Sequence, residues 1–182
     1  MSLNQSLLLI ALLIAASAFF SLAEISLAAS RRLRLRQLAD NGDLRADKVL
    51  RVQEHPGPYF TVVQIGLNAV AILGGVVGEG AWSPYFVQFF VLWLSPSAAQ
   101  TAAFIASFLV TISLFLVFAD LFPKRLGMNN PEQLAMRMVG PMQALTTLFK
   151  PVVWLFSKST DGLFTLLGLP AQRDDKVTSA DI

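Results

Sequence analysis

Three long apolar stretches dominate the pattern of hydrophobic and polar positions. Residues 6–29 contain one charged residue, Glu24, and residues 58–77 and 98–119 contain none. A helix rises 1.5 Å per residue, so about 20 residues cross a hydrocarbon core roughly 30 Å thick. Each stretch is therefore long enough to span a membrane. The pattern predicts an all-α integral membrane protein with three transmembrane helices.

The distribution of basic residues predicts how these spans are oriented. The segment 30–57 is rich in Lys and Arg, whereas the connection 78–100 contains neither. All Lys and Arg lie in three blocks, at 31–51, 124–137 and 150–176. Because cytoplasmic loops carry an excess of Lys and Arg, we expect 30–57 and 124–182 inside the cell and the N-terminus outside. The connection 78–100 is then an external loop.

Two further regions predict amphipathic helices beside the membrane. Within 30–57, a turn at residues 41–43 separates two short helical patterns, which suits a helical pair on the inner leaflet. Residues 141–169 are apolar but interrupted by prolines and charges, and no uncharged run there reaches about 17 residues. A fourth span is possible, but amphipathic or re-entrant juxtamembrane helices are favoured. Together these helices would form a belt on the cytoplasmic side.

Composition narrows the chemistry that the chain can perform. Hydrophobic residues make up 54% of the chain and charged residues 14%, which is unusual for a soluble domain. A net charge of +2 is too small to indicate nucleic-acid binding, so the lipid bilayer is the expected partner. The chain has no Cys and one His, His55, which excludes a thiolate site and a polyhistidine metal site within one subunit. No nucleophile–base pair or phosphate-binding loop is evident, so neither an enzyme nor a bound cofactor is expected.

Polar side chains nevertheless recur on one face of each predicted span. They are Ser17, Ser21 and Glu24 in the first span, Gln64, Asn68, Gly75 and Glu79 in the second, and Ser113 and Asp120 in the third. Residues three, four, seven or eleven positions apart lie on the same helical face, so each set forms a stripe. Hydroxyl, amide and carboxylate oxygens are the ligands that hard cations and ammonium groups prefer. Glu79 is expected near the outer boundary, in contact with solvent.

Pro123 adds a specific feature beside Asp120. Proline has no N–H to donate to the carbonyl of Ala119, four residues earlier. Irregular backbone at membrane depth is tolerated chiefly where it lines a cavity or is satisfied by a neighbour. The group formed by Ala119, Asp120 and Pro123 is therefore a candidate cation site.

Structural roles are open alternatives for most of these residues. Asp120 is also placed to pair with Lys124, four residues later. Glu24 is harder to explain structurally, because an intramembrane carboxylate is costly and no Lys or Arg lies within the predicted spans. Helix packing alone is the alternative role of Ser17, Ser21 and Asn68, and close helix packing is the expected role of Gly74, Gly75 and Gly78.

Three motifs resemble the transmembrane domain of the CorC/CNNM family. Residues 17–24 read SAFFSLAE, residues 64–68 read QIGLN and residues 118–124 read FADLFPK. That family carries Phe-Phe-Ser-x-x-Glu, Gln-Ile-Gly followed by Asn, and Phe-Gly-Glu-x-x-Pro-Lys segments in the same order. The resemblance implies a homodimer whose transmembrane domain covers residues 1–169. Residues 170–182 would be a cytoplasmic linker toward a missing paired CBS module, through which alone an adenine nucleotide would bind.

The resemblance also implies cation transport through an acidic cavity that opens to the cytoplasm. By motif, the candidate cation or substrate ligands are Ser21, Glu24, Asn68 and Asp120, which would also be the metal ligands if the cation is magnesium. Supporting positions are Ser17, Gln64, Gly75, Ala119, Pro123 and Lys124. The chain departs from the family at Ala119, where Gly is usual, and at Asp120, where Glu is usual.

Magnesium and a polyamine are both candidate substrates. The family is associated with magnesium efflux coupled to sodium, which would make Mg²⁺ or Na⁺ the transported or coupling ion. Residues 23–26, 68–75 and 118–125 resemble the polyamine-exporting branch of the family, which exports putrescine and cadaverine. A shorter carboxylate at Asp120 and an added methyl at Ala119 suit a loose ligand better than a tight magnesium cage, so a polyamine comes first. A cation sensor or scaffold subunit that does not transport is the remaining alternative, and the bacterial inner membrane is the expected location.

Overall fold

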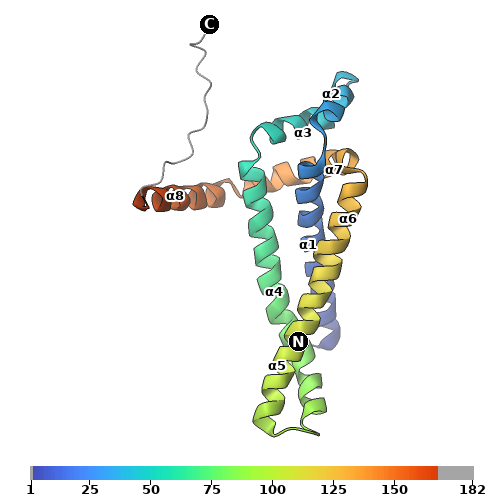
Figure 1. The fold of residues 1–182 in the computed structure, drawn as a ribbon, viewed down its shortest axis with the longest axis vertical. Helices are drawn as coiled ribbons and strands as arrows, with labels where there is room; N and C mark the ends of the chain where they lie inside the picture. The colour runs from blue at the N-terminus through green and yellow to red at the C-terminus, as the bar shows by residue number, and fades with distance from the viewer. Residues whose placement is uncertain (1, 168–182) are drawn as a thin grey trace.

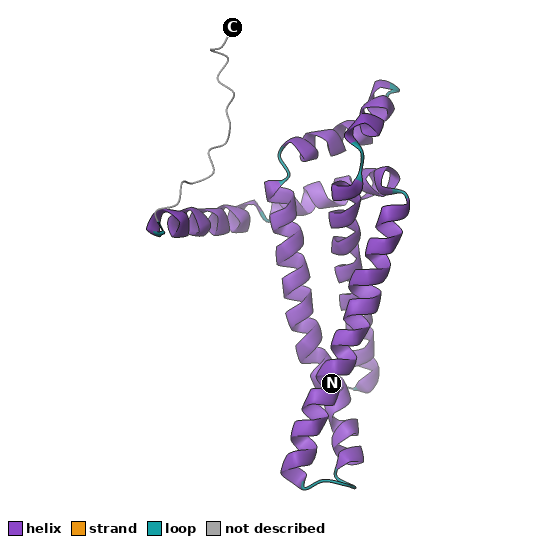
Figure 2. Cartoon of the chain, viewed as in Figure 1, coloured by secondary structure: helices purple, strands orange, loops and turns teal. Residues whose placement is uncertain are grey.

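The computed structural model describes residues 2–167, and helices joined by short connections make up this part of the chain (Figures 1 and 2). The elements are α1 (Leu3–Ala29), α2 (Arg32–Asp40), α3 (Leu44–Glu54), α4 (Gly57–Phe90), α5 (Pro96–Leu114), the π-helical segment η1 (Phe115–Leu121), α6 (Phe122–Asn129), α7 (Pro131–Leu148) and α8 (Lys150–Leu166). The predicted linker at 170–182 lies outside the described residues.

The three predicted spans are confirmed. Helices α1 and α4 and the continuous helix Pro96–Asn129, which joins α5, η1 and α6, are long and apolar enough to cross a membrane. Helix α4 packs against both α1 and α5, and α1 also packs against α6 (Figure 1). The protein is thus an all-α, multi-pass membrane protein, as its hydrophobic pattern predicts.

The predicted extent of the connection at 78–100 is wrong. Helix α4 continues to Phe90 with Pro84 inside it, so the connection to α5 is only residues 91–95. The end of α4 and the start of α5 form a helical hairpin that extends beyond the N-terminal end of α1 (Figure 1). Helix stability in proteins comes mainly from tertiary packing, which here overrides the local signals of glycine and proline. As a result Glu79 lies inside α4 rather than in the connection that follows it.

Small residues allow α4 and α5 to approach closely. A Cβ atom on Gly74 would collide with the ring of Phe115, and one on Gly78 would collide with Thr111. The facing side of α5 is a stripe of small buried residues, Ala99, Ala103, Ser107 and Thr111. The prediction that these glycines allow close helix packing is therefore confirmed.

Helices α2, α3 and α7 close one end of the bundle (Figure 1). The amide of Gln53 on α3 donates to Oγ of Ser30 over 2.9 Å and to the carbonyls of Ser30 and Leu27, which satisfies carbonyl groups at the C-terminal end of α1. On the other side, the buried Glu132 of α7 accepts a hydrogen bond from the N–H of Arg31. These contacts hold α1 in a fixed position relative to the cap.

The predicted helical pair is also confirmed. Asp43 caps α3 by accepting a hydrogen bond from the N–H of Arg45, and Gly42 before it has a φ of 93° in the turn. The hydrogen bonds from the Arg45 guanidinium lower the pKa of Asp43 below its usual value. The apolar sides of α2 and α3 join the core through Leu35, Ala46 and Val49.

Helix α8 projects crosswise from the bundle (Figure 1). Its main contacts within the described residues are with α4 and α7. Large apolar side chains on α8, such as Trp154 and Leu155, remain exposed. Helices α7 and α8 are separate, neither is among the candidate spans of residues 2–167, and α8 runs across the direction of the spans, which favours the juxtamembrane prediction over a fourth span.

Candidate cation site

A π-helical turn positions Asp120 near the end of the third span. In η1 the N–H of Phe122 donates to the carbonyl of Val117, five residues earlier. The buried Pro123 follows directly, and a wider turn suits it because a proline ring collides with the carbonyl four residues back in an α-helix. The break expected at Pro123 is therefore a local change of helical pitch, and the helix continues to Asn129. Such π turns occur frequently at functional sites.

Four polar side chains meet between α1 and the third span, and we call them the carboxylate cluster. Oγ of the fully buried Ser21 donates to Oδ1 of Asp120 over 3.4 Å. Nζ of Lys124 is 2.7 Å from the same Oδ1 and 3.7 Å from Oε2 of Glu24. The side chains of Glu24 and Asp120 are 30% and 39% exposed, so a solute can reach them. The structure thus brings together three of the four predicted ligands.

Lys124 corrects one expectation from the sequence. No basic residue was expected within the spans, and Glu24 therefore had no assigned partner. Because the third span continues through Pro123 to Asn129, Lys124 is part of the same helix, one turn after Asp120. The predicted ion pair between Asp120 and Lys124 forms, and the ammonium also reaches Glu24 on α1.

A cavity of about 800 Å³ opens beside the cluster, between α4 and the third span, and we call it the central cavity. Asp120 lines it together with the predicted residues Ser17, Asn68, Gly75 and Ala119. Most of the remaining wall is apolar, with aromatic side chains from α5 and η1. Residues from all three polar stripes therefore share one cavity.

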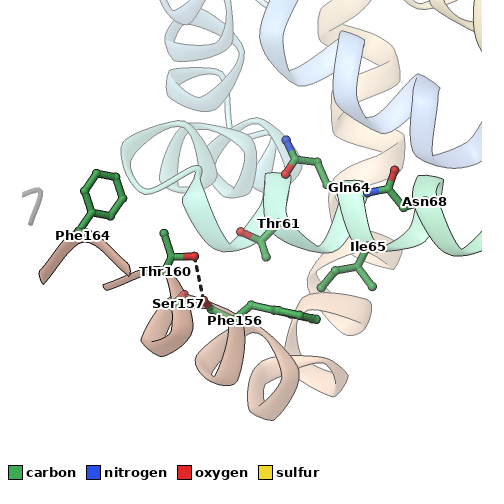
Figure 3. A pocket seen from close by; sticks show the side chains of 8 residues that line it. All are labelled: Thr61, Gln64, Ile65, Asn68, Phe156, Ser157, Thr160 and Phe164. Atoms are coloured by element: carbon green, nitrogen blue, oxygen red, sulfur yellow. Dashed lines mark hydrogen bonds between the residues drawn. The ribbon is translucent and has the colours of Figure 1, made fainter. Parts of the chain in front are cut away.

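Asn68 and Gln64 are placed differently from the cluster. Asn68 shares the central cavity with Asp120 but makes no hydrogen bond to Ser21, Glu24 or Asp120 within the described residues. Gln64 lines a neighbouring cavity of about 670 Å³ between α4 and α8, the α8 cavity, and Asn68 lines this one as well. In Figure 3 both amides project from α4, whereas Phe156 and Ser157 come from α8.

Sequence reasoning assigned no site role to Glu79, which also lines the central cavity. The available signal was its position eleven residues after Asn68, on the same helical face. That signal was outweighed by the expectation that the helix ended before Glu79.

Comparison with known proteins supports the resemblance. The family model of the cyclin M transmembrane N-terminal domain, CNNM, matches residues 8–182. The chain belongs to the CNNM family. The polyamine export protein of Salmonella typhimurium is 51% identical over 178 residues, which cover 98% of this chain and 40% of that protein.

Two further relatives carry the same printed name. The polyamine export protein of Escherichia coli K12 is 50% identical over 178 residues, covering 98% of this chain and 40% of that protein. The one from Haemophilus influenzae is 47% identical over 187 residues, covering 100% of this chain and 42% of that protein. This CNNM chain thus spans about two fifths of the length of these relatives.

The second span of the CNNM domain is tied to the cluster by a buried contact. The hydroxyl of Tyr59 on α4 donates to the carbonyl of Ala23 over 3.2 Å, directly before Glu24. No group of three or more His, Cys, Asp or Glu side chains that could hold a metal ion occurs within residues 2–167. The oxygens that the cluster offers to a cation come from two carboxylates and one hydroxyl, and the Lys124 ammonium already contacts both carboxylates.

Proposed function

We propose that this CNNM protein exports polyamines such as putrescine and cadaverine, with Glu24 and Asp120 as the carboxylates that bind the substrate. The contact of Lys124 with both carboxylates carries the proposal, because it shows that their spacing accepts a primary ammonium group. A polyamine presents the same chemical group. The printed names of the three relatives support this substrate class.

Binding would proceed by exchange of one ammonium for another. A substrate ammonium displaces Lys124 from Asp120 and gains charge-assisted hydrogen bonds, which are stronger than neutral ones. Ser21 keeps the Asp120 carboxylate in place through its hydroxyl. The methylene chain of the substrate then lies against the apolar wall of the central cavity, and Asn68 offers an amide oxygen at its edge.

Magnesium transport coupled to sodium is the second candidate. Ser21, Glu24, Asn68 and Asp120 all offer oxygen donors, which Mg²⁺ prefers. However, Mg²⁺ needs about six oxygens at roughly 2.1 Å, whereas the cluster brings together two carboxylates and one hydroxyl. The substrate ammonium of a polyamine needs no such cage.

Counterflow with the purified full-length protein in proteoliposomes tests the proposal. Radiolabelled putrescine and a magnesium-sensitive dye are used on the same preparation. We expect putrescine flux in the wild type and at least a tenfold loss in Glu24→Gln and Asp120→Asn. The matched control is Glu54→Gln, which removes an exposed carboxylate that pairs with Arg32 at the end of α3.

Each outcome has a separate meaning. Magnesium flux without putrescine flux would refute the polyamine proposal in favour of the second candidate. Wild-type rates in both cluster variants would refute the carboxylate cluster as the site. If neither cation moves, the protein is a sensor or scaffold subunit rather than a transporter.

A further inference from the structure

Three cavities follow one another along a single face of α4. The α8 cavity and the central cavity share Asn68. The central cavity and a third cavity of about 670 Å³, which lies in the α4 and α5 hairpin, share Glu79 and Phe104. We call the third one the hairpin cavity. Since each neighbouring pair has a wall residue in common, the three cavities adjoin.

The series of cavities is long enough to cross a membrane. It begins at Thr61 in the α8 cavity and ends at Gln88 in the hairpin cavity. At 1.5 Å per residue this part of α4 is roughly 40 Å long, about the thickness of a bilayer with its headgroups. No single cavity in the series has this length.

Glu79 occupies a particular place in the series. It lies within α4, the helix of the second span, and it forms no ion pair or hydrogen bond with any residue in 2–167. An unpaired carboxylate within a membrane span is costly, and such groups usually face a water-filled path for ions. The ring of Phe104, which lines both adjoining cavities, can in addition attract a cation at this junction.

Glu79 is also well separated from the carboxylate cluster. In the antiparallel packing of α4 and α5, Gly74 faces Phe115 and Gly78 faces Thr111. Continuing this register, Asp120 lies level with a point on α4 about ten residues before Glu79. At 1.5 Å per residue, Asp120 and Glu79 are therefore roughly 15 Å apart along the helix axis. The two carboxylates therefore lie at different levels along α4.

We propose that Glu79 is a second ammonium-binding site, and that the three cavities form the route along which the substrate passes between the Asp120 site and the far side of the membrane. This inference rests on the proposed function for the identity of the substrate. Asp120 and Glu79 would hold the substrate at successive positions. Ser83 and Gln88 continue the polar wall beyond Glu79.

The first test separates binding from transport. In Glu79→Gln we expect putrescine binding, measured by isothermal titration calorimetry, to stay within about twofold of the wild type, because the carboxylate cluster is intact. Putrescine counterflow should fall at least tenfold, whereas the control Glu54→Gln should transport normally. Counterflow within twofold of the wild type in Glu79→Gln would overturn the role of Glu79.

The second test does not depend on the substrate, so it remains decisive if the wild type moves no putrescine. The chain contains no Cys, so a single thiol can be introduced by Ser83→Cys, one turn after Glu79. The thiol is then treated with two thiosulfonate reagents of similar size, one carrying a quaternary ammonium cation and the other a sulfonate anion. Their reaction rates measure how well a cation and an anion reach this position. The control is Leu73→Cys, an exposed α4 position that lines none of the three cavities.

We expect the Ser83→Cys thiol to react at least tenfold faster with the cationic reagent than with the anionic one. Adding Glu79→Gln should reduce this preference to less than about threefold. The Leu73→Cys thiol should react slowly with both reagents. Equal, slow reaction of Ser83→Cys and Leu73→Cys would refute the route, and a cation preference that survives Glu79→Gln would refute the site. A monodisperse size-exclusion profile confirms that each variant is folded.

Discussion

Nζ of Lys124 lies 2.7 Å from Oδ1 of Asp120, the carboxylate one helical turn earlier, and 3.7 Å from Oε2 of Glu24 on another span. A residue of the protein thus occupies the position that the proposed function gives to a substrate ammonium. Because both carboxylates are partly shielded from water, this contact matters more than a pair on the open surface. We therefore propose that Lys124 is a tethered competitor of the substrate.

Removing this competitor should strengthen substrate binding. In Lys124→Gln we expect the Kd for putrescine to fall about tenfold, equivalent to roughly 1.4 kcal/mol, because the two carboxylates lose their internal cation. Calorimetry on the full-length protein measures this change. Lys124→Arg keeps the charge and should bind putrescine as the wild type does or more weakly. Unchanged binding in Lys124→Gln would refute the competition, and weaker binding would show that Lys124 assists the substrate instead.

The π-helical turn should be necessary for transport but not for stability. In Pro123→Ala the backbone regains an N–H, and the segment around Asp120 can return to α-helical pitch. This change would rotate Asp120 relative to Ser21 on α1. We expect putrescine counterflow to fall at least tenfold while the melting temperature stays the same or rises. Normal transport in this variant would mean that the turn does not position the carboxylate.

The close approach of α4 and α5 gives a stability prediction. A methyl group in Gly78→Ala collides with Thr111, and overpacking of this kind costs about 1–3 kcal/mol. The melting temperature in detergent should therefore fall. Gly80→Ala is the matched control, because its Cβ meets no atom within 4 Å and alanine favours a helix. Equal melting temperatures for the two variants would contradict the packing.

The orientation in the membrane is a separate prediction. We expect the turn between α2 and α3 inside the cell and the connection between α4 and α5 outside. An impermeant thiol reagent added to intact cells should label Ser95→Cys and leave Asn41→Cys unlabelled, as both positions are exposed. The reverse pattern would invert the topology.

The assembly prediction is a homodimer. Gln64 and Asn68 are exposed on the second span of a single chain, and polar side chains on a span usually face protein or a water-filled cavity. A second copy could cover this face. The mass of the full-length protein, corrected for bound detergent, should equal two protomers, and a value of one protomer at micromolar concentration would count against the dimer.

The sequence by itself determined the three spans and the helical pair at 30–57. These features depend on local hydrophobicity and turn chemistry, which can be seen in a single stretch of residues. The stripe of Ser17, Ser21 and Glu24 could likewise be found, because a helix repeats every 3.6 residues.

Only the tertiary structure decided how the stripes of different spans meet. Packing of α4 against α5 continues the second helix through Pro84 to Phe90 and brings Glu79 into the central cavity. The π-helical turn carries the third helix past Pro123, so that Lys124 reaches Glu24. Both results depend on contacts between residues far apart in the chain, and a hydrophobic pattern along one helix contains no information about the register of its neighbours.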